Sequence, residues 1–187
     1  MTVATLSVQK LVAGCRGRVD LAARLPVNGI GVELGVAQGG FSARILEVSS
    51  LAFLYSIDQW ADKHDSAEYR SAVARLDPYR TRNAIWRMRF DEARPLIPDH
   101  SLDFLYIDGY AHTGEEDGAT IRQWWSAVKP GGVMAGDDYD PETWPRVVHA
   151  VDRFVRHAGT SLAVIPRSAE PDDPVYGNYP TWVVIHD

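Results

Sequence analysis

Apolar residues alternate along the chain between the 3.6-residue spacing of a helix and the short continuous runs of a buried strand. Helices are predicted over residues 6–25, 41–48, 65–76, 115–128 and 145–157, and strands over residues 30–34, 52–57, 84–88, 102–107, 133–136, 162–165 and 182–185. Strands that alternate with helices predict an α/β fold. We expect a Rossmann-like, doubly wound, mostly parallel seven-stranded sheet with helices on both faces.

Proline and glycine divide this pattern. The first helix stops before Pro26, the sequence Lys129-Pro130-Gly131-Gly132 is a helix stop and a turn, and residues 166–180 form a loop rich in Pro, Asp and Gly. A length of 187 residues suits one domain. We assign residues 29–187 to it, and residues 1–28 to an N-terminal helical segment that either covers a ligand as a lid or packs on a second subunit of a homodimer.

The composition and net charge of the chain exclude several classes of partner and site. Hydrophobic residues make up 45% of the chain and charged residues 24%, values typical of a globular protein, and the net charge of -6 argues against nucleic-acid and anionic-membrane partners. Cys15 is the only cysteine, which excludes an intramolecular disulfide and a cysteine-based zinc site. With no signal-peptide pattern and no apolar run near the ~20 residues that span a bilayer, we expect a cytoplasmic protein.

Acidic residues follow the predicted strands. Ligands of a parallel sheet bind beyond the carboxyl ends of its strands. The strands at 30–34, 52–57, 102–107 and 133–136 are followed by Gly35, Asp58, Asp108 and the pair Asp137-Asp138. These positions are the candidate site.

The first strand leads into Glu33-x-Gly35-x-x-x-Gly39-Gly40 and then a helix, a turn suited to close approach of backbone and ligand. A dinucleotide loop has the pattern G-x-G-x-x-G, which lets a helix N-terminus face a pyrophosphate. Glu33 replaces the first glycine of that pattern. A carboxylate there suits a cationic amino-acid ligand and repels a pyrophosphate, although a turn that only packs helix on strand has similar glycines.

The second strand ends in Asp58-Gln59-Trp60. An acid at this place is positioned to accept hydrogen bonds from a ribose diol, in dehydrogenases and methyltransferases alike. Trp60 either stacks on an adenine or packs in the protein.

The segment from Glu33 to Ser42 resembles the first motif of class I S-adenosylmethionine-dependent methyltransferases, and Ile57-Asp58-Gln59-Trp60 resembles their second motif. The resemblance implies that Gly35 and its neighbours contact the methionine part of the cofactor and that Asp58 binds the ribose hydroxyls. Relatives often carry Gly-Asp-Ser where this chain has Arg89-Phe90-Asp91. The predicted cofactor-binding residues are Glu33, Gly35, Gln38, Gly39, Gly40, Phe41, Asp58, Gln59, Trp60, Phe90, Asp91 and Asp108.

If the strands at 102–107 and 133–136 are neighbours, Asp108, Asp137 and Asp138 meet at one rim, where they repel one another unless protonated or neutralised by a cation. Oxygen ligands suit Mg²⁺, with Mn²⁺ or Ca²⁺ as substitutes. The segments Ile107-Asp108-Gly109 and Asp137-Asp138-Tyr139 resemble metal-dependent O-methyltransferases of the macrocin and novobiocin-pathway type. That resemblance implies metal-ligand roles for the three aspartates; otherwise they cap helices or make loop hydrogen bonds.

The function expected is methyl transfer to a hydroxyl of a small sugar-like or natural-product-like molecule, assisted by Mg²⁺. The cation would stabilise the alkoxide, with Asp108 in the catalytic set. His112 is the preferred general base and Tyr110 the alternative. Three other interpretations stay open: a metal-independent methyltransferase of another small acceptor, an NAD-dependent oxidoreductase, and a non-enzymatic module that retains S-adenosylmethionine.

Overall fold

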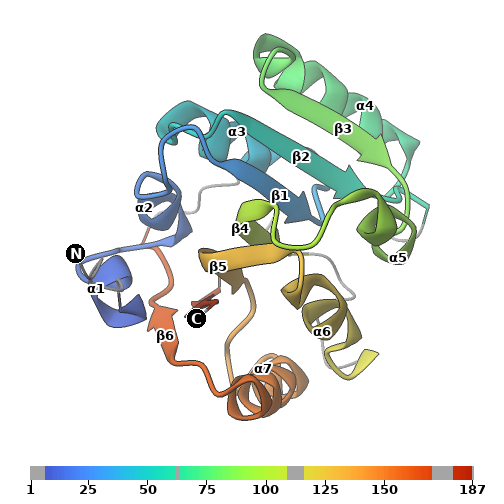
Figure 1. Cartoon of the computed structure of the whole chain (residues 1–187). Helices are drawn as coiled ribbons and strands as arrows, with labels where there is room; N and C mark the ends of the chain where they lie inside the picture. The colour runs from blue at the N-terminus through green and yellow to red at the C-terminus, as the bar shows by residue number, and fades with distance from the viewer. Residues whose placement is uncertain (1–6, 62–63, 109–115, 170–178, 187) are drawn as a thin grey trace.

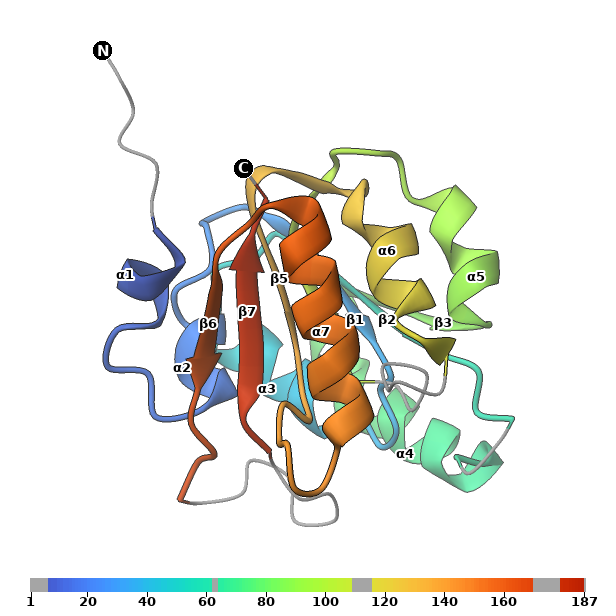
Figure 2. The ribbon, with the colours of Figure 1, turned by 90° about the horizontal axis from the view of Figure 1, so that it is seen from below.

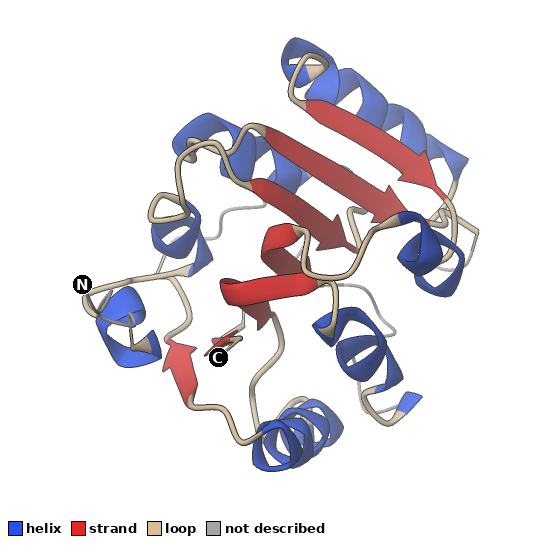
Figure 3. Cartoon of the chain, viewed as in Figure 1, coloured by secondary structure: helices blue, strands red, loops and turns tan. Residues whose placement is uncertain are grey.

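The computed structural model describes residues 7–61, 64–108, 116–169 and 179–186. Within these ranges the strands form one seven-stranded sheet in the order β3-β2-β1-β4-β5-β7-β6 (Figure 3). Neighbours from β3 through β5 pair in parallel, whereas β7 runs antiparallel to both β5 and β6. The predicted sheet is confirmed, with strands β1 Ile30–Leu34, β2 Phe53–Asp58, β3 Asn83–Arg87, β4 Leu102–Ile107, β5 Val128–Gly136, β6 Leu162–Ile165 and β7 Thr181–Ile185.

Helices cover both faces of the sheet because successive strand residues point to opposite sides. Phe104 and Tyr106 belong to one hydrophobic cluster and Leu105 and Ile107 to the other. The first cluster packs under α1 (Val8–Val12), α2 (Arg18–Ala22), α3 (Gly40–Val48) and α4 (Ser66–Leu76), and the second under α5 (Phe90–Ala93), α6 (Ala119–Trp125) and α7 (Pro145–Ala158) (Figures 1 and 2). Short 3₁₀ turns, η1 (Asp77–Tyr79) and η2 (Arg94–Leu96), extend α4 and α5. Among the described helices, none has the length and apolar character needed to cross a bilayer.

The single helix predicted over residues 6–25 is wrong. The segment forms two five-residue helices, α1 and α2, because Gly14 adopts a left-handed φ of 75° and turns the chain after α1. The Arg24 guanidinium fastens the turn by donating hydrogen bonds to the carbonyls of Leu11, at 2.6 Å, and Ala13, at 2.8 Å. The break makes Arg18 the first residue of a new helix, with its side chain directed into the protein.

The turn predicted at Lys129-Pro130-Gly131-Gly132 is also wrong, since these residues lie inside β5. Gly131 has φ 80°, and the sheet pairing still continues past it. Gly131 N–H donates to the His186 carbonyl at 2.6 Å, and His186 N–H donates to Gly132 at 2.9 Å. The register between β4 and β5 shifts here, so the glycines form a paired irregularity rather than a turn.

The strand order reverses between β1 and β4. The connection after β1 leads to β2 on one side, and the connection after β4 leads to β5 on the other. Helices therefore diverge at this point and leave a crevice beyond the carboxyl ends of the strands, where doubly wound folds bind ligands. The acidic residues singled out in the sequence follow these strands.

Candidate active site

The loop after β1 has the backbone conformation expected of a close-approach turn. Gly35 adopts φ 90°, and its N–H donates to the Ile57 carbonyl of β2 at 2.9 Å. Ala37 and Gly39 also have positive φ, 47° and 79°, before α3 begins at Gly40. A Cβ atom on Gly39 would lie 3.2 Å from Cα of Ala72 in α4. The missing side chain of Gly39 thus allows α3 and α4 to pack, a contact between two helices rather than the packing of helix on strand considered from the sequence.

Asp58 holds this loop through its carboxylate. Its Oδ2 accepts hydrogen bonds from the backbone N–H groups of Val36, at 2.9 Å, and Ala37, at 3.0 Å, while its Oδ1 accepts from Trp60 N–H at 3.0 Å. The side chain is buried. One carboxylate therefore orders the turns after both β1 and β2, and its predicted contact with a ribose diol stays a prediction.

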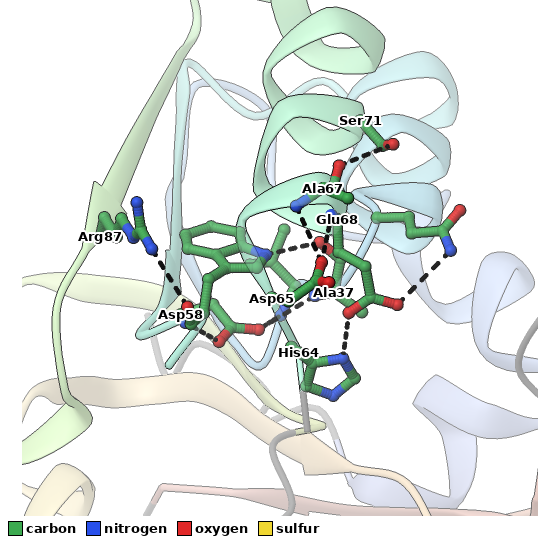
Figure 4. A network of polar contacts seen from close by, with 11 residues as sticks. Ala37, Asp58, His64, Asp65, Ala67, Glu68, Ser71 and Arg87 are labelled. Carbon is green, nitrogen blue, oxygen red and sulfur yellow. Dashed lines mark hydrogen bonds and ion pairs between the residues drawn. The ribbon is translucent and has the colours of Figure 1, made fainter. Parts of the chain in front are cut away.

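Trp60 packs under the loop. Only 1% of the residue is exposed, its indole N–H donates to the Ala37 carbonyl at 2.8 Å, and its ring meets Tyr69 edge to face. Arg87 donates to the Trp60 carbonyl at 3.1 Å (Figure 4). These contacts show that Trp60 packs in the protein, which was one of its two predicted roles; the other was stacking on an adenine.

A second polar network lies beside the loop, at the start of α4 (Figure 4). Asp65 accepts hydrogen bonds from the N–H groups of Ala67 and Glu68 and so caps the helix. The Glu68 carboxylate lies 2.6 Å from His64 Nδ1 and accepts a 3.5 Å hydrogen bond from Gln38. His64 lines the pocket described below, and no motif in the sequence singled it out.

Glu33 is almost fully buried, with 1% of the residue exposed. Its carboxylate accepts a hydrogen bond from the Ser42 hydroxyl, which lies 2.8 Å from the Ser56 hydroxyl, and Asn83 donates to Ser56 at 2.9 Å. Burial raises the pKa of Glu33 to about 8, against the opposing effect of the Ser42 hydrogen bond. The acid that the sequence placed toward the ligand is thus mostly protonated near neutral pH in the unliganded protein.

This raised pKa predicts a pH dependence of stability. The folded protein keeps the Glu33 proton up to a pKa of about 8, whereas the unfolded chain loses it near 4.5. The Glu33 contribution to stability is therefore complete below about pH 4.5 and is lost as pH rises toward about 8. Urea unfolding across this range should show Glu33→Gln gaining stability relative to wild type as pH rises. The same substitution at exposed Glu47 should keep the wild-type profile, and parallel profiles for Glu33→Gln and wild type would refute the assignment.

The structure brings Asp108 and Asp137 to one rim. Asp108 N–H donates to the Leu34 carbonyl of β1 at 2.7 Å, and Asp137 N–H donates to the Ile107 carbonyl of β4 at 3.2 Å, so both follow adjacent parallel strands. Asp138 comes next with a left-handed φ of 65°. Burial and then the Asp108 charge raise the pKa of Asp137 well above its usual range and that of Asp138 to about 7. Three carboxyl groups are therefore crowded at this rim.

Arg18 places a cation between two of these acids. Its Nη1 donates to Asp108 Oδ2 at 2.5 Å and to Asp137 Oδ2 at 3.1 Å, and the guanidinium lies 4.2 Å from the centre of the Phe41 ring. The sequence did not indicate Arg18, because the continuous helix predicted there hid the break that directs it inward. The signal in the sequence was the pair of glycines, Gly14 and Gly17, that precede Arg18 within the apolar spacing.

A pocket of about 200 Å³ opens over these groups. The loop after β1 and Phe41 form one wall, and Trp144 and Tyr179, whose rings meet edge to face at 6.0 Å, form another. Glu33, Asp108, Asp137 and Asp138 line it together with Arg18 and His64. A floor lined by carboxyl groups and an aromatic wall suit a small, planar or cationic ligand.

Three other predicted site residues, Phe90, Asp91 and Gln59, are not among the residues that line this pocket. Phe90 and Asp91 begin α5 beyond β3, and the Asp91 carboxylate accepts two hydrogen bonds from the Arg89 guanidinium. Gln59 is half-buried next to Asp58. The predicted bases Tyr110 and His112 lie outside the described residues, so their roles stay predictions.

Comparisons with known proteins identify the family and the fold of the chain. Residues 32–139 match a family model described as a methyltransferase domain. A search of curated proteins found no match. Among solved structures, the chain resembles precorrin 8W decarboxylase of Methanobacterium thermoautotrophicum (18% identity, 89% of this chain and 85% of that chain, TM-score 0.63) and a SAM-dependent O-methyltransferase of Thermotoga maritima (14%, 91% and 65%, 0.63). It also resembles spermidine synthase of Thermotoga maritima (15%, 92% and 58%, 0.67). At identities this low, the structural similarity establishes a shared fold alone, and the fold serves several reactions.

Proposed function

The chain belongs to the methyltransferase-domain family as a class I S-adenosylmethionine-dependent methyltransferase, and from this premise we propose that it methylates a hydroxyl oxygen of a small molecule. The net charge of -6 and the acidic residues that line the pocket favour a small acceptor over a nucleic acid. The name of the Thermotoga maritima O-methyltransferase, a structural neighbour, supports oxygen as the acceptor atom.

The residues at the end of β1 fit the cofactor. Gly35 presents backbone without a side chain to the pocket, and the carboxyl groups of Glu33 and Asp108 line the pocket beside it. S-adenosylmethionine, when bound, supplies an electrophilic methyl group on a positively charged sulfur. In this proposal the loop from Gly35 to Gly39 holds its amino-acid part, and Asp58 keeps the loop in the conformation that does so.

The observation that carries the proposal is the set of carboxylates at the ends of β4 and β5, beside the cofactor loop. A hydroxyl becomes a better nucleophile when a nearby base accepts its proton. Asp108 and Asp138 line the pocket where the acceptor would lie, and Trp144 and Tyr179 would orient a ring-shaped acceptor over them. Holding both reactants in one pocket supplies much of the rate enhancement.

The divalent metal expected from the sequence stays a prediction, and the described geometry does not fit it. Within residues 7–61, 64–108, 116–169 and 179–186, no group of three His, Cys, Asp or Glu side chains is arranged to hold a metal ion. Asp108 and Asp137 are instead bridged by Arg18. The proposed reaction therefore uses the side chains of this chain alone.

The test is an acceptor screen with the purified enzyme. S-adenosylhomocysteine is measured after incubation with S-adenosylmethionine and either a hydroxylated set of sugars and phenols or a matched set of amines, and mass spectrometry locates the added methyl group. The proposal expects methyl ethers. It expects Asp108→Asn to lower kcat by about 10²–10⁴-fold, and Asp103→Asn, at the opposite end of β4, to leave kcat near wild type. Methylation of amines alone, or no turnover of any acceptor, would reject oxygen as the target.

A further inference from the structure

Arg18 is the feature of the site that neither the sequence motifs nor the family match accounts for. It precedes the matched region, which begins at residue 32. Its side chain is 4% exposed, and one nitrogen, Nη1, contacts an oxygen of both Asp108 and Asp137. A buried arginine on two buried or half-buried acids is costly to place unless the charges compensate one another.

The surroundings of Arg18 explain its position. The extended Gly17 leads into α2 so close to Ser168 that a Cβ atom on this glycine would lie 2.9 Å from the serine Cβ. The guanidinium then stacks on Phe41, the second residue of α3. Backbone packing and the aromatic face thus direct the charge onto the carboxylates.

A cation at this place relieves the repulsion among the carboxylates. Asp108, Asp137 and Asp138 lie at adjacent positions of one rim, where like charges repel strongly away from water. Two kinds of cation can relieve this repulsion. A divalent ion requires several oxygens converging at roughly 2.0–2.6 Å, whereas a guanidinium requires only oxygens within hydrogen-bond distance of its N–H groups.

The geometry matches the guanidinium. Oδ2 of Asp108 and Oδ2 of Asp137 both point at Arg18 Nη1, at 2.5 and 3.1 Å, and these are oxygens that a metal would use. Asp137 Oδ1 is buried and has no hydrogen-bond partner among the described residues, so Arg18 satisfies only one oxygen of this carboxyl group. Among the described residues, no group of three His, Cys, Asp or Glu side chains is arranged to hold a metal ion, which agrees with a guanidinium as the cation.

We propose that Arg18 takes the place of the divalent cation in this enzyme, neutralising Asp108 and Asp137 so that methyl transfer proceeds without a metal. Arg18 is thus a positioning residue that fixes the two carboxylates. The statement about turnover rests on the proposed function, whereas the statement about metal binding does not.

The first experiment measures metal binding without any acceptor. Mn²⁺ is titrated into wild type, Arg18→Gln, Arg18→Lys and Arg16→Gln, and free Mn²⁺ is followed by electron paramagnetic resonance. Arg16 is the matched control, because it removes the same charge from a side chain that is 90% exposed. We expect no stoichiometric binding to wild type, Arg18→Lys or Arg16→Gln, and an affinity at least about tenfold higher in Arg18→Gln, where the acids lose their cation.

Stoichiometric Mn²⁺ binding by wild type would overturn the proposal, as would a folded Arg18→Gln protein with no gain over Arg16→Gln. Circular dichroism establishes folding. If Arg18→Gln does not fold, the titrations of wild type and Arg18→Lys still test the proposal, because stoichiometric Mn²⁺ binding by either protein would contradict it. Where an acceptor is known, wild-type turnover should be unchanged by EDTA, and restoration of an EDTA-inhibited enzyme by Mg²⁺ would overturn the proposal. Failure to find an acceptor affects only the proposed function.

Discussion

Replacing Gly35 with valine is expected to abolish binding of S-adenosylmethionine while the protein still folds. Gly35 has φ 90°, where a β-branched residue is strained by about 1–3 kcal/mol. Relief of that strain would move the loop away from β2, where Gly35 N–H meets the Ile57 carbonyl, and the new side chain would enter the pocket. Calorimetric titration of the cofactor into the variant measures the loss.

Gly159→Val is the matched control for this experiment. Gly159 ends α7 with φ 69°, and a Cβ atom there would meet nothing within 4 Å. The substitution imposes similar backbone strain, and it does so at the end of α7 far from the cofactor loop. It should lower stability but retain cofactor affinity. Tight cofactor binding by a folded Gly35→Val protein would contradict the proposed loop geometry.

Asp58→Ala is expected to lower both the stability of the unliganded protein and its cofactor affinity. Three backbone N–H groups, those of Val36, Ala37 and Trp60, would lose a charged acceptor, at a cost of about 1–3 kcal/mol for each donor left buried and unsatisfied. Urea unfolding without ligand measures the first effect, and calorimetric titration of S-adenosylmethionine measures the second.

The unliganded measurement separates two roles of Asp58. If the carboxylate only contacted a ribose diol, stability without the cofactor would stay at the wild-type value. Asp103→Ala serves as control, because Asp103 also accepts a backbone hydrogen bond, from Ile30 N–H at 2.8 Å, at the end of β4 away from the pocket. It should lower stability and leave cofactor affinity unchanged.

The sheet was predictable because strands buried on both faces read as short apolar runs. The acids of the rim were predictable because they follow those runs directly. Asp108 and Asp137 meet through strand pairing, which the alternation of strands and helices already indicates.

The remaining parts depend on contacts between distant segments. Gly14 broke a helix that the apolar spacing favoured, and the glycines at 131 and 132 continued a strand where their local preference indicated a turn. At Gly14 the conformational freedom of glycine itself ended the helix, whereas at 131 and 132 pairing with His186 outweighed the local preference for a turn. Arg18 was missed because only the fold shows that a residue of the N-terminal segment reaches the rim.

The ion pairs of Arg18 also bear on how the protein reaches its native state. Arg18 lies 90 residues before Asp108 and 119 residues before Asp137, so these contacts close very long loops. Long-range contacts form late, because the chain entropy lost in closing a loop has to be offset first. A nascent chain carries Arg18 from the start but cannot pair it with Asp137 until β5 has been synthesised and added to the sheet. The pocket is therefore completed only when the central sheet has formed.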